Sequence, residues 1–231
     1  MRILFIALWC LLPLGLVAFH YGPGQEKMAL DHSGAALDRA RAHLDASEWE
    51  AAIPELEAAL AALPEGHGSE AQRIQLELLK ARMMTGKLPE ARGELEELLA
   101  RVDASAEPEL HADVLEALSS ARFHMTYLMK LEGLPETEWG PEIDAARQER
   151  KLLLQQAGSP AAASRQADAL ESAIKLARMD PAELYGKAIP KQCQGCCSGK
   201  CNKPGKKPGK KKLPKDARGA SSGPPIDGEG S

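Results

Sequence analysis

Residues 47–64 read SEWEAAIPELEAALAALP, and this stretch decides the fold. Its apolar residues recur at spacings of three and four, so in a helix they fall on one face. This stripe consists of Trp49, Ala52, Ile53, Leu56, Ala59, Leu60 and Leu63. Pro64, Gly66 and Gly68 follow directly and are typical of a turn. The stretch therefore predicts one amphipathic helix that is closed by a turn.

The same arrangement recurs further along the chain. Residues 86–102 again place a Gly-containing turn before an apolar stripe, and two more stripes follow. The stripes are Leu88, Ala91, Leu95, Leu98, Leu99 and Val102; then Leu110, Val114, Leu118, Ala121, Met125 and Leu128; then Ala167, Leu170, Ile174 and Ala177. Pro89, Pro108 and Pro141 are expected in first turns of helices, and Ser159 is expected to cap the last long helix. No long stretch alternates with period two, so the sequence predicts an all-α fold.

Two segments share a more specific pattern. Ser47-Glu48-Trp49-Glu50-Ala51-Ala52-Ile53, with Ala59-Leu60 and Pro64, resembles the second half of a tetratricopeptide repeat. Gly86-Lys87-Leu88-Pro89-Glu90-Ala91, with Leu98-Leu99, is similar to it, and a degenerate third unit spans 109–156. The resemblance implies stacked antiparallel helical hairpins, an α-solenoid, over residues 33–158, with residues 159–186 sealing the end of the stack. A generic helical bundle is the alternative arrangement.

The resemblance also implies a binding groove lined by the first helix of each hairpin. In this arrangement Arg41, Arg73 and Lys80 would face the groove. Such cations favour a protein or peptide ligand that carries acidic side chains or a terminal carboxylate. Arg39, His43 and Arg82 stand where the family has small or apolar residues, so these first helices depart from the family pattern.

The N-terminal segment, residues 1–21, has an apolar run from Ile3 to Phe19 behind Arg2. This pattern predicts a single-pass membrane anchor with the bulk of the chain outside the cytoplasm. The alternative is a signal peptide, whose cleavage would leave a secreted or periplasmic protein. An apolar leader followed by repeats resembles exported or membrane-anchored bacterial repeat proteins.

The C-terminal region differs sharply in charge from the rest. Residues 187–231 hold 11 basic and 3 acidic side chains, whereas residues 1–186 hold the remaining 18 basic and 30 acidic ones. The basic tail, 203–231, is rich in Lys, Gly and Pro and is expected to be disordered. Nucleic acid is not expected as its partner, because an exported tail would not meet it and no aromatic residues are interleaved.

Four cysteines lie close together within segment 187–202. Cys193, Cys196, Cys197 and Cys201 form C-x2-C-C-x3-C, a donor set suited to zinc or another thiophilic metal. Two disulfides among the same residues are the alternative, because an exported chain meets an oxidising compartment.

No sequence motif of a common enzyme class is present. The chain has no phosphate-binding Gly-rich loop, no G-x-S-x-G and no H-E-x-x-H, and its six histidines are scattered. The histidines are expected on helix surfaces, and acidic pairs such as Glu96-Glu97 on solvated faces. We therefore expect a membrane-anchored scaffold for protein interaction without catalysis. The alternative is a metal-binding or thiol-redox protein that uses the cysteine cluster.

Overall fold

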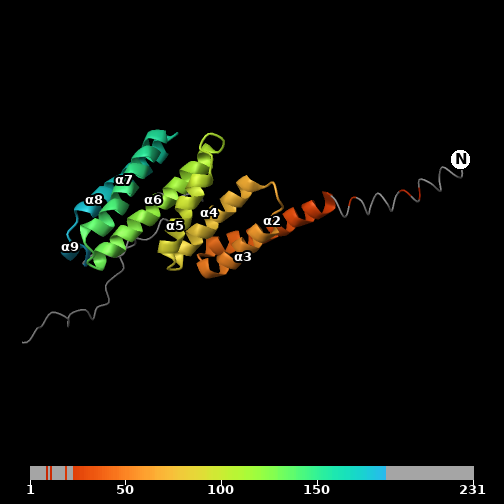
Figure 1. Cartoon of the computed structure of the whole chain (residues 1–231), viewed down its shortest axis with the longest axis horizontal. Coiled ribbons are helices and arrows are strands. Elements are labelled where there is room, and N and C mark those ends of the chain that lie inside the picture. The colour runs from red at the N-terminus through yellow and green to blue at the C-terminus, as the bar shows by residue number, and fades with distance from the viewer. Residues whose placement is uncertain (1–8, 10, 12–18, 20–22, 186–231) are drawn as a thin grey trace, which may run out of the picture. The chain divides into compact units, whose positions relative to one another are not determined.

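A computed structural model describes Trp9, Leu11, Phe19 and residues 23–185 of the chain. The described residues 23–185 form eight helices and no strand (Figure 1). These are α2 (Pro23–Ala46), α3 (Trp49–Ala62), α4 (Gly68–Met84), α5 (Leu88–Arg101), α6 (Pro108–Leu131), α7 (Glu136–Gln156), α8 (Pro160–Arg178) and α9 (Pro181–Tyr185). The all-α class predicted from the sequence is confirmed.

Each helix from α2 to α7 packs against the next one along the chain, and α4 also contacts α6. Side-chain contacts show that paired helices run antiparallel. In the α2–α3 pair, Ser33 Oγ donates to the Ala59 carbonyl at 2.9 Å, while Arg39 binds Glu55 nearer the connecting turn. The short α9 returns to α6, where Leu184 is fully buried and the Tyr185 hydroxyl donates to the Leu131 carbonyl.

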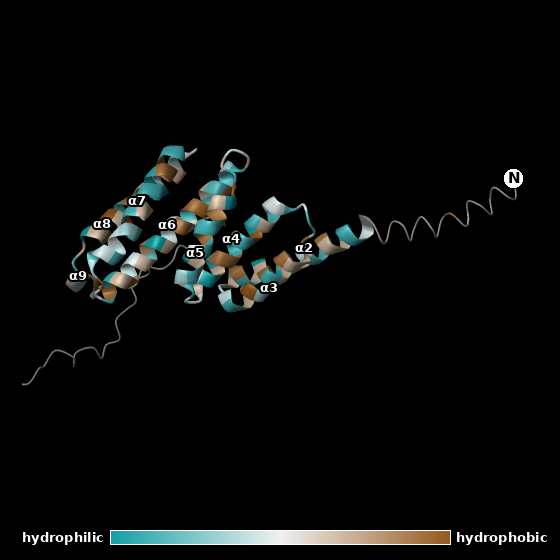
Figure 2. Cartoon of the chain, viewed as in Figure 1, coloured by the Kyte–Doolittle hydropathy of each residue, from teal (hydrophilic) through white to brown (hydrophobic). Residues whose placement is uncertain are grey.

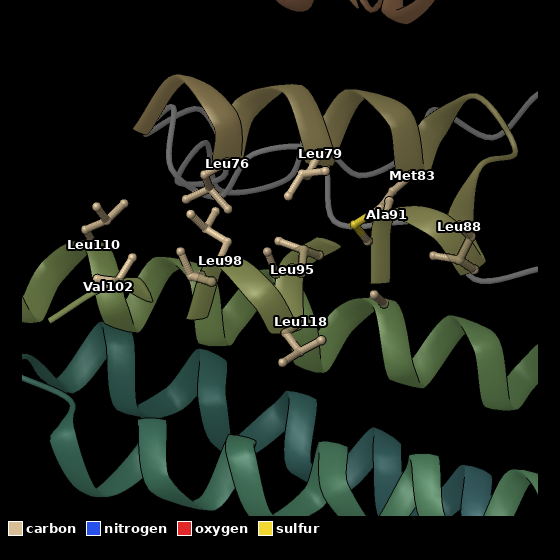
Figure 3. Packing of buried hydrophobic residues seen from close by; sticks show 13 residues of the cluster. Leu76, Leu79, Met83, Leu88, Ala91, Leu95, Leu98, Val102, Leu110 and Leu118 are labelled. Carbon is tan, nitrogen blue, oxygen red and sulfur yellow. The ribbon is translucent and has the colours of Figure 1, made fainter. Parts of the chain in front are cut away.

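The apolar stripes of the sequence supply most of the core. Figure 2 shows hydrophobic and hydrophilic residues interleaved around the helices, as expected of amphipathic elements. The largest cluster joins α4, α5 and α6, and Figure 3 shows its side chains meeting between these helices. Ala52 and Ala91, the small residues of the two repeat-like segments, are completely buried, which allows close approach of neighbouring helices. The first two stripes therefore face the interior as predicted.

Turn positions also agree with the sequence. Gly66 and Gly86 adopt φ values of 94° and 83°, a left-handed conformation that side chains other than Gly rarely tolerate. At the second turn, the Lys87 amide donates to the Arg82 carbonyl and so closes the end of α4. Ser159 caps α8 as expected, since its Oγ accepts from the Ala162 amide at 3.2 Å.

Three positional expectations are wrong. Pro141 lies inside α7 and not in its first turn, because the helix already begins at Glu136. The nitrogen of Pro141 carries no hydrogen, so one backbone carbonyl in the preceding turn lacks its helical donor. Pro141 is exposed, so water can bind that carbonyl. The other two errors concern stripes. On α6 the stripe drifts outward and leaves Leu128 exposed. On α8 the buried residues are Gln166, Ala173 and Leu176, and Ala167 of the predicted stripe is exposed.

The first helix also begins earlier than Ser33, at Pro23. Of the predicted anchor, the structure describes only Trp9, Leu11 and Phe19. The cysteine cluster and the basic tail lie outside the described residues. Among the helices that the structure describes, none combines the length and apolarity that crossing a membrane requires.

Candidate functional site

The predicted groove residues lie on α2 and α4. Arg73 and Lys80 are seven residues apart on α4, so they share one face of that helix. Arg73 binds Glu107 at 3.1 Å, and Lys80 binds Glu77 at 2.8 Å. Arg41 lies on α2, where it binds Asp38 one turn away and stays largely exposed. The structure therefore gives each of the three cations an acidic neighbour.

The face shared by α4 and α6 carries an additional carboxylate, Asp113. Partial burial raises its pKa above the usual value; Lys80 is the main opposing influence, while Glu116 and Glu77 reinforce the rise. These influences place Asp113 close to the cations of α4. We call Arg73, Glu77, Lys80, Glu107 and Asp113 the α4–α6 face, which bears charges of both signs.

Arg39, His43 and Arg82, which depart from the family pattern, all pair with acids. Arg39 binds Glu55, and His43 Nδ1 lies 2.7 Å from a Glu48 oxygen. Arg82 bridges two neighbouring helices, with Glu57 of α3 and Glu94 of α5. Small residues are nevertheless buried nearby on α2, at Ala36 and Ala40. Helix α2 therefore meets α3 through these alanines, and its charged residues lie at the edge of that contact.

A second group of charges lies between helices, and no sequence pattern predicts it. Arg92 and Glu96 of α5, Arg122 of α6, and Glu142 and Glu149 of α7 form what we call the charge cluster. Arg122 binds all three carboxylates: Glu96, Glu142 at 3.3 Å and Glu149 at 3.0 Å. Glu96 was expected on a solvated face; its side chain is 38% exposed, and it is also bound by Arg92 of its own helix and by Arg122, because α6 packs against α5.

Arg150 continues this polar seam toward α8. It is buried and donates to Gln166 Oε1 at 2.8 Å, to the Glu116 carbonyl and to Ser120 Oγ. Gln166 in turn donates to Glu116 at 3.0 Å. These contacts explain why α8 buries Gln166, since a buried guanidinium must find acceptors. The sequence signal was an arginine within the buried stripe of α7, between Ala146 and Leu153.

Lys130 closes the other end of the α6–α8 contact. Its ammonium donates to the carbonyls of Leu176 and Ala177, in the last turn of α8, and lies 4.1 Å from the centre of the Trp139 ring. A cation at a helix C-terminus satisfies orphan carbonyls and the helix dipole. Burial lowers the pKa of Lys130, while Glu136 and Asp180 oppose that change. We assign this lysine a structural role.

One histidine contradicts the expectation that all lie on helix surfaces. His124 is buried on α6, with Nδ1 2.8 Å from the Ser120 carbonyl and its ring edge-on to Phe123. All five cysteines lie outside the described residues, so the proposed metal ligands stay a prediction. Within the described part of the chain, no group of three or more His, Asp or Glu is placed to hold a metal ion.

Comparisons with protein-family models, with curated proteins and with solved structures find no match to this chain. The assignment of a function consequently rests on the geometry of the described residues and on the sequence.

Proposed function

We propose that this protein is a helical-repeat scaffold that binds a protein or peptide partner and performs no catalysis. In this proposal the hairpins stack as in tetratricopeptide repeats, and residues 1–21 hold the chain at a membrane with its bulk outside the cytoplasm. The observation that supports it best is the contact between α4 and α6. This contact sets the first helices of two successive hairpins side by side, as a repeat groove requires.

The α4–α6 face and Arg41 of α2 together supply the polar groups for recognition. The ion pairs of Arg73 and Arg41 are substantially exposed, and exposed pairs contribute only about 0–1 kcal/mol each. A partner carboxylate can therefore replace Glu107 or Asp38 at little cost and form charge-assisted hydrogen bonds of its own. Asp113, between the cations, would select against a partner that is acidic throughout, because like charges repel.

We expect a triple variant, Arg41→Ala, Arg73→Ala and Lys80→Ala, to bind acidic peptides at least about tenfold more weakly than the wild type, since a single lost charge-assisted contact already has that magnitude. The measurement uses the full-length protein and an array of peptides, each paired with a version in which Gln and Asn replace Glu and Asp.

The matched control removes three cations elsewhere, Arg147, Lys151 and Lys175, on α7 and α8. Arg147 and Lys175 are paired within their own helices, as Arg41 is. The control should keep wild-type binding. Equal losses in both variants would reduce the effect to net charge, and no loss in the first would reject the α4–α6 face as the site.

A second candidate function rests on the four cysteines at 193–201. Their spacing, C-x2-C-C-x3-C, favours a metal-binding or thiol-redox role, and the lysines that follow would offset the charge of four thiolates.

For this candidate we expect thiol titration of protein purified from its native compartment to show no accessible thiol before treatment. A Cys10→Ser background restricts the measurement to the cluster. Bound metal predicts four thiols that appear when a chelator is added; disulfides predict thiols that appear only on reduction. Four reactive thiols in untreated protein would exclude both arrangements.

A further inference from the structure

The contact between α6 and α7 is unusually polar for the middle of a helical fold. On the neighbouring side, α6 meets α4 and α5 through a cluster of leucines and alanines. Toward α7, the charge cluster lies beside apolar side chains such as Tyr127 and Ile143, and the side chains of Arg122 and Glu142 are largely enclosed, with exposed fractions of 13% and 15%. The contact between α6 and α7, the two helices of the third hairpin, therefore depends on charge as well as on apolar packing.

The charges of this cluster do not cancel. Two guanidinium groups, Arg92 and Arg122, face three carboxylates, Glu96, Glu142 and Glu149. The cluster is one proton short of neutrality when all three acids are ionised. A net charge in a poorly solvated site is costly, so the site favours taking up a proton.

Glu149 is the carboxylate that should receive the proton. Its side chain is 14% exposed, and its Oε1 lies 3.0 Å from Arg122 Nε. Its other oxygen, Oε2, is buried and accepts no hydrogen bond from the described residues. Glu142, by contrast, is held by both arginines, with one oxygen on Arg92 and the other shared with Arg122. Protonation at Glu149 therefore disturbs the fewest contacts.

Electrostatics agrees with this geometry. Burial raises the pKa of Glu149 to about 7; Arg122 and Arg150 oppose the rise, and Glu96 and Glu142 add to it. The groups around it are Arg92 and Glu96 on α5, Arg122 and Glu116 on α6, and Glu142 and Arg150 on α7. From α8 comes the neutral amide of Gln166, which binds Arg150.

We propose that the contact of α6 with α7 and α8 is a pH-sensitive joint, held more firmly when Glu149 carries a proton. In an opened joint Glu149 meets water and ionises near its ordinary value of 4.5, whereas in the closed joint it keeps its proton up to about pH 7. The closed form thus binds more protons between these values, so its stability falls as pH rises from about 5 to 7 and levels off above that. Residues of α2 and α3 do not share this dependence.

Hydrogen exchange of the full-length protein tests the joint at pH 5.5 and 8.5, after correction for the intrinsic pH dependence of exchange. We expect protection of α7 amides to fall by roughly 30-fold between these values, while α2–α3 amides keep theirs. Glu149→Gln, which imitates the protonated acid, should abolish the fall in α7. Glu138→Gln, the same change at an exposed position of α7, should retain it. A fall that persists in Glu149→Gln, or is absent from the wild type, overturns the proposal.

A direct titration keeps the proposal testable if Glu149→Gln does not fold. Carbon-13 NMR of the wild-type protein reports the ionisation of individual glutamate carboxyls. A midpoint near pH 7 for Glu149 is expected, and a midpoint near 4.5 would overturn the proposal whatever the exchange results. The outcome is independent of partner binding, since Glu149 lies outside the α4–α6 face.

Discussion

Replacing Arg122 with alanine is expected to lower the free energy of unfolding by about 3–5 kcal/mol at pH 7, the usual cost of removing one partner from a buried ion pair. Its guanidinium contacts Glu96, Glu142 and Glu149, and its side chain is 13% exposed. Without it, Glu149 loses its ion pair, Glu96 and Glu142 keep only Arg92, and the ionic contact of α6 with α7 is reduced to Glu116 and Arg150 among the described residues. Urea denaturation followed by circular dichroism measures the change.

Acid should partly rescue this variant. Below pH 6 Glu149 is protonated in the folded state, so the uncompensated negative charge decreases and the deficit relative to the wild type shrinks. Arg147→Ala serves as the control, because Arg147 binds only its exposed helix neighbour Asp144 among the ion pairs of the described residues. The control should cost less than about 1 kcal/mol. A similarly small cost for Arg122→Ala would mean that the cluster does not stabilise the fold.

Replacing Leu98 with alanine is expected to lower the free energy of unfolding by about 2–5 kcal/mol, the range measured for buried leucines. Leu98 is completely buried between α4, α5 and α6, among Leu79, Leu95 and Leu118 (Figure 3). Truncation removes buried apolar atoms and leaves a cavity that rigid neighbouring helices fill poorly. Urea denaturation followed by circular dichroism again measures the change in the free energy of unfolding.

Leu128→Ala provides the comparison for this second change. Leu128 belongs to an apolar stripe of the sequence, yet 39% of it is exposed on α6. It should lose less than about 1 kcal/mol, because less apolar area returns to water and no enclosed cavity forms. Equal losses for Leu98→Ala and Leu128→Ala would contradict the packing described for α5 and α6.

The two changes probe different parts of the fold, and they differ in how far the sequence anticipated them. Leu98 was identified from periodicity alone, since a helix repeats its faces every 3.6 residues whatever surrounds it. Arg122 was not identified. Its neighbours in sequence are Ala121 and Phe123, and its acidic partners lie 20 or more residues away on other helices.

What the sequence determined by itself is local. Apolar spacing predicted helices over most of the described chain, Gly66 and Gly86 marked turns, and Ser159 marked a helix start. These features depend on a few consecutive residues, because backbone conformation and capping are short-range effects. Ala52 and Ala91 likewise belong to the apolar stripes that the sequence predicts, and both are completely buried.

The tertiary structure alone decided which face of a helix turns inward where two choices differ little. Gln166 and Ala167 are adjacent, about 100° apart around α8, and apolarity favours burying the alanine. The structure buries Gln166 because Arg150, itself enclosed between α6, α7 and α8, requires its amide oxygen. The same holds for Glu149, whose charge depends on arginines and acids that three helices bring together. Buried charge is settled by partners distant in sequence, since desolvation and pairing act through space and not along the chain.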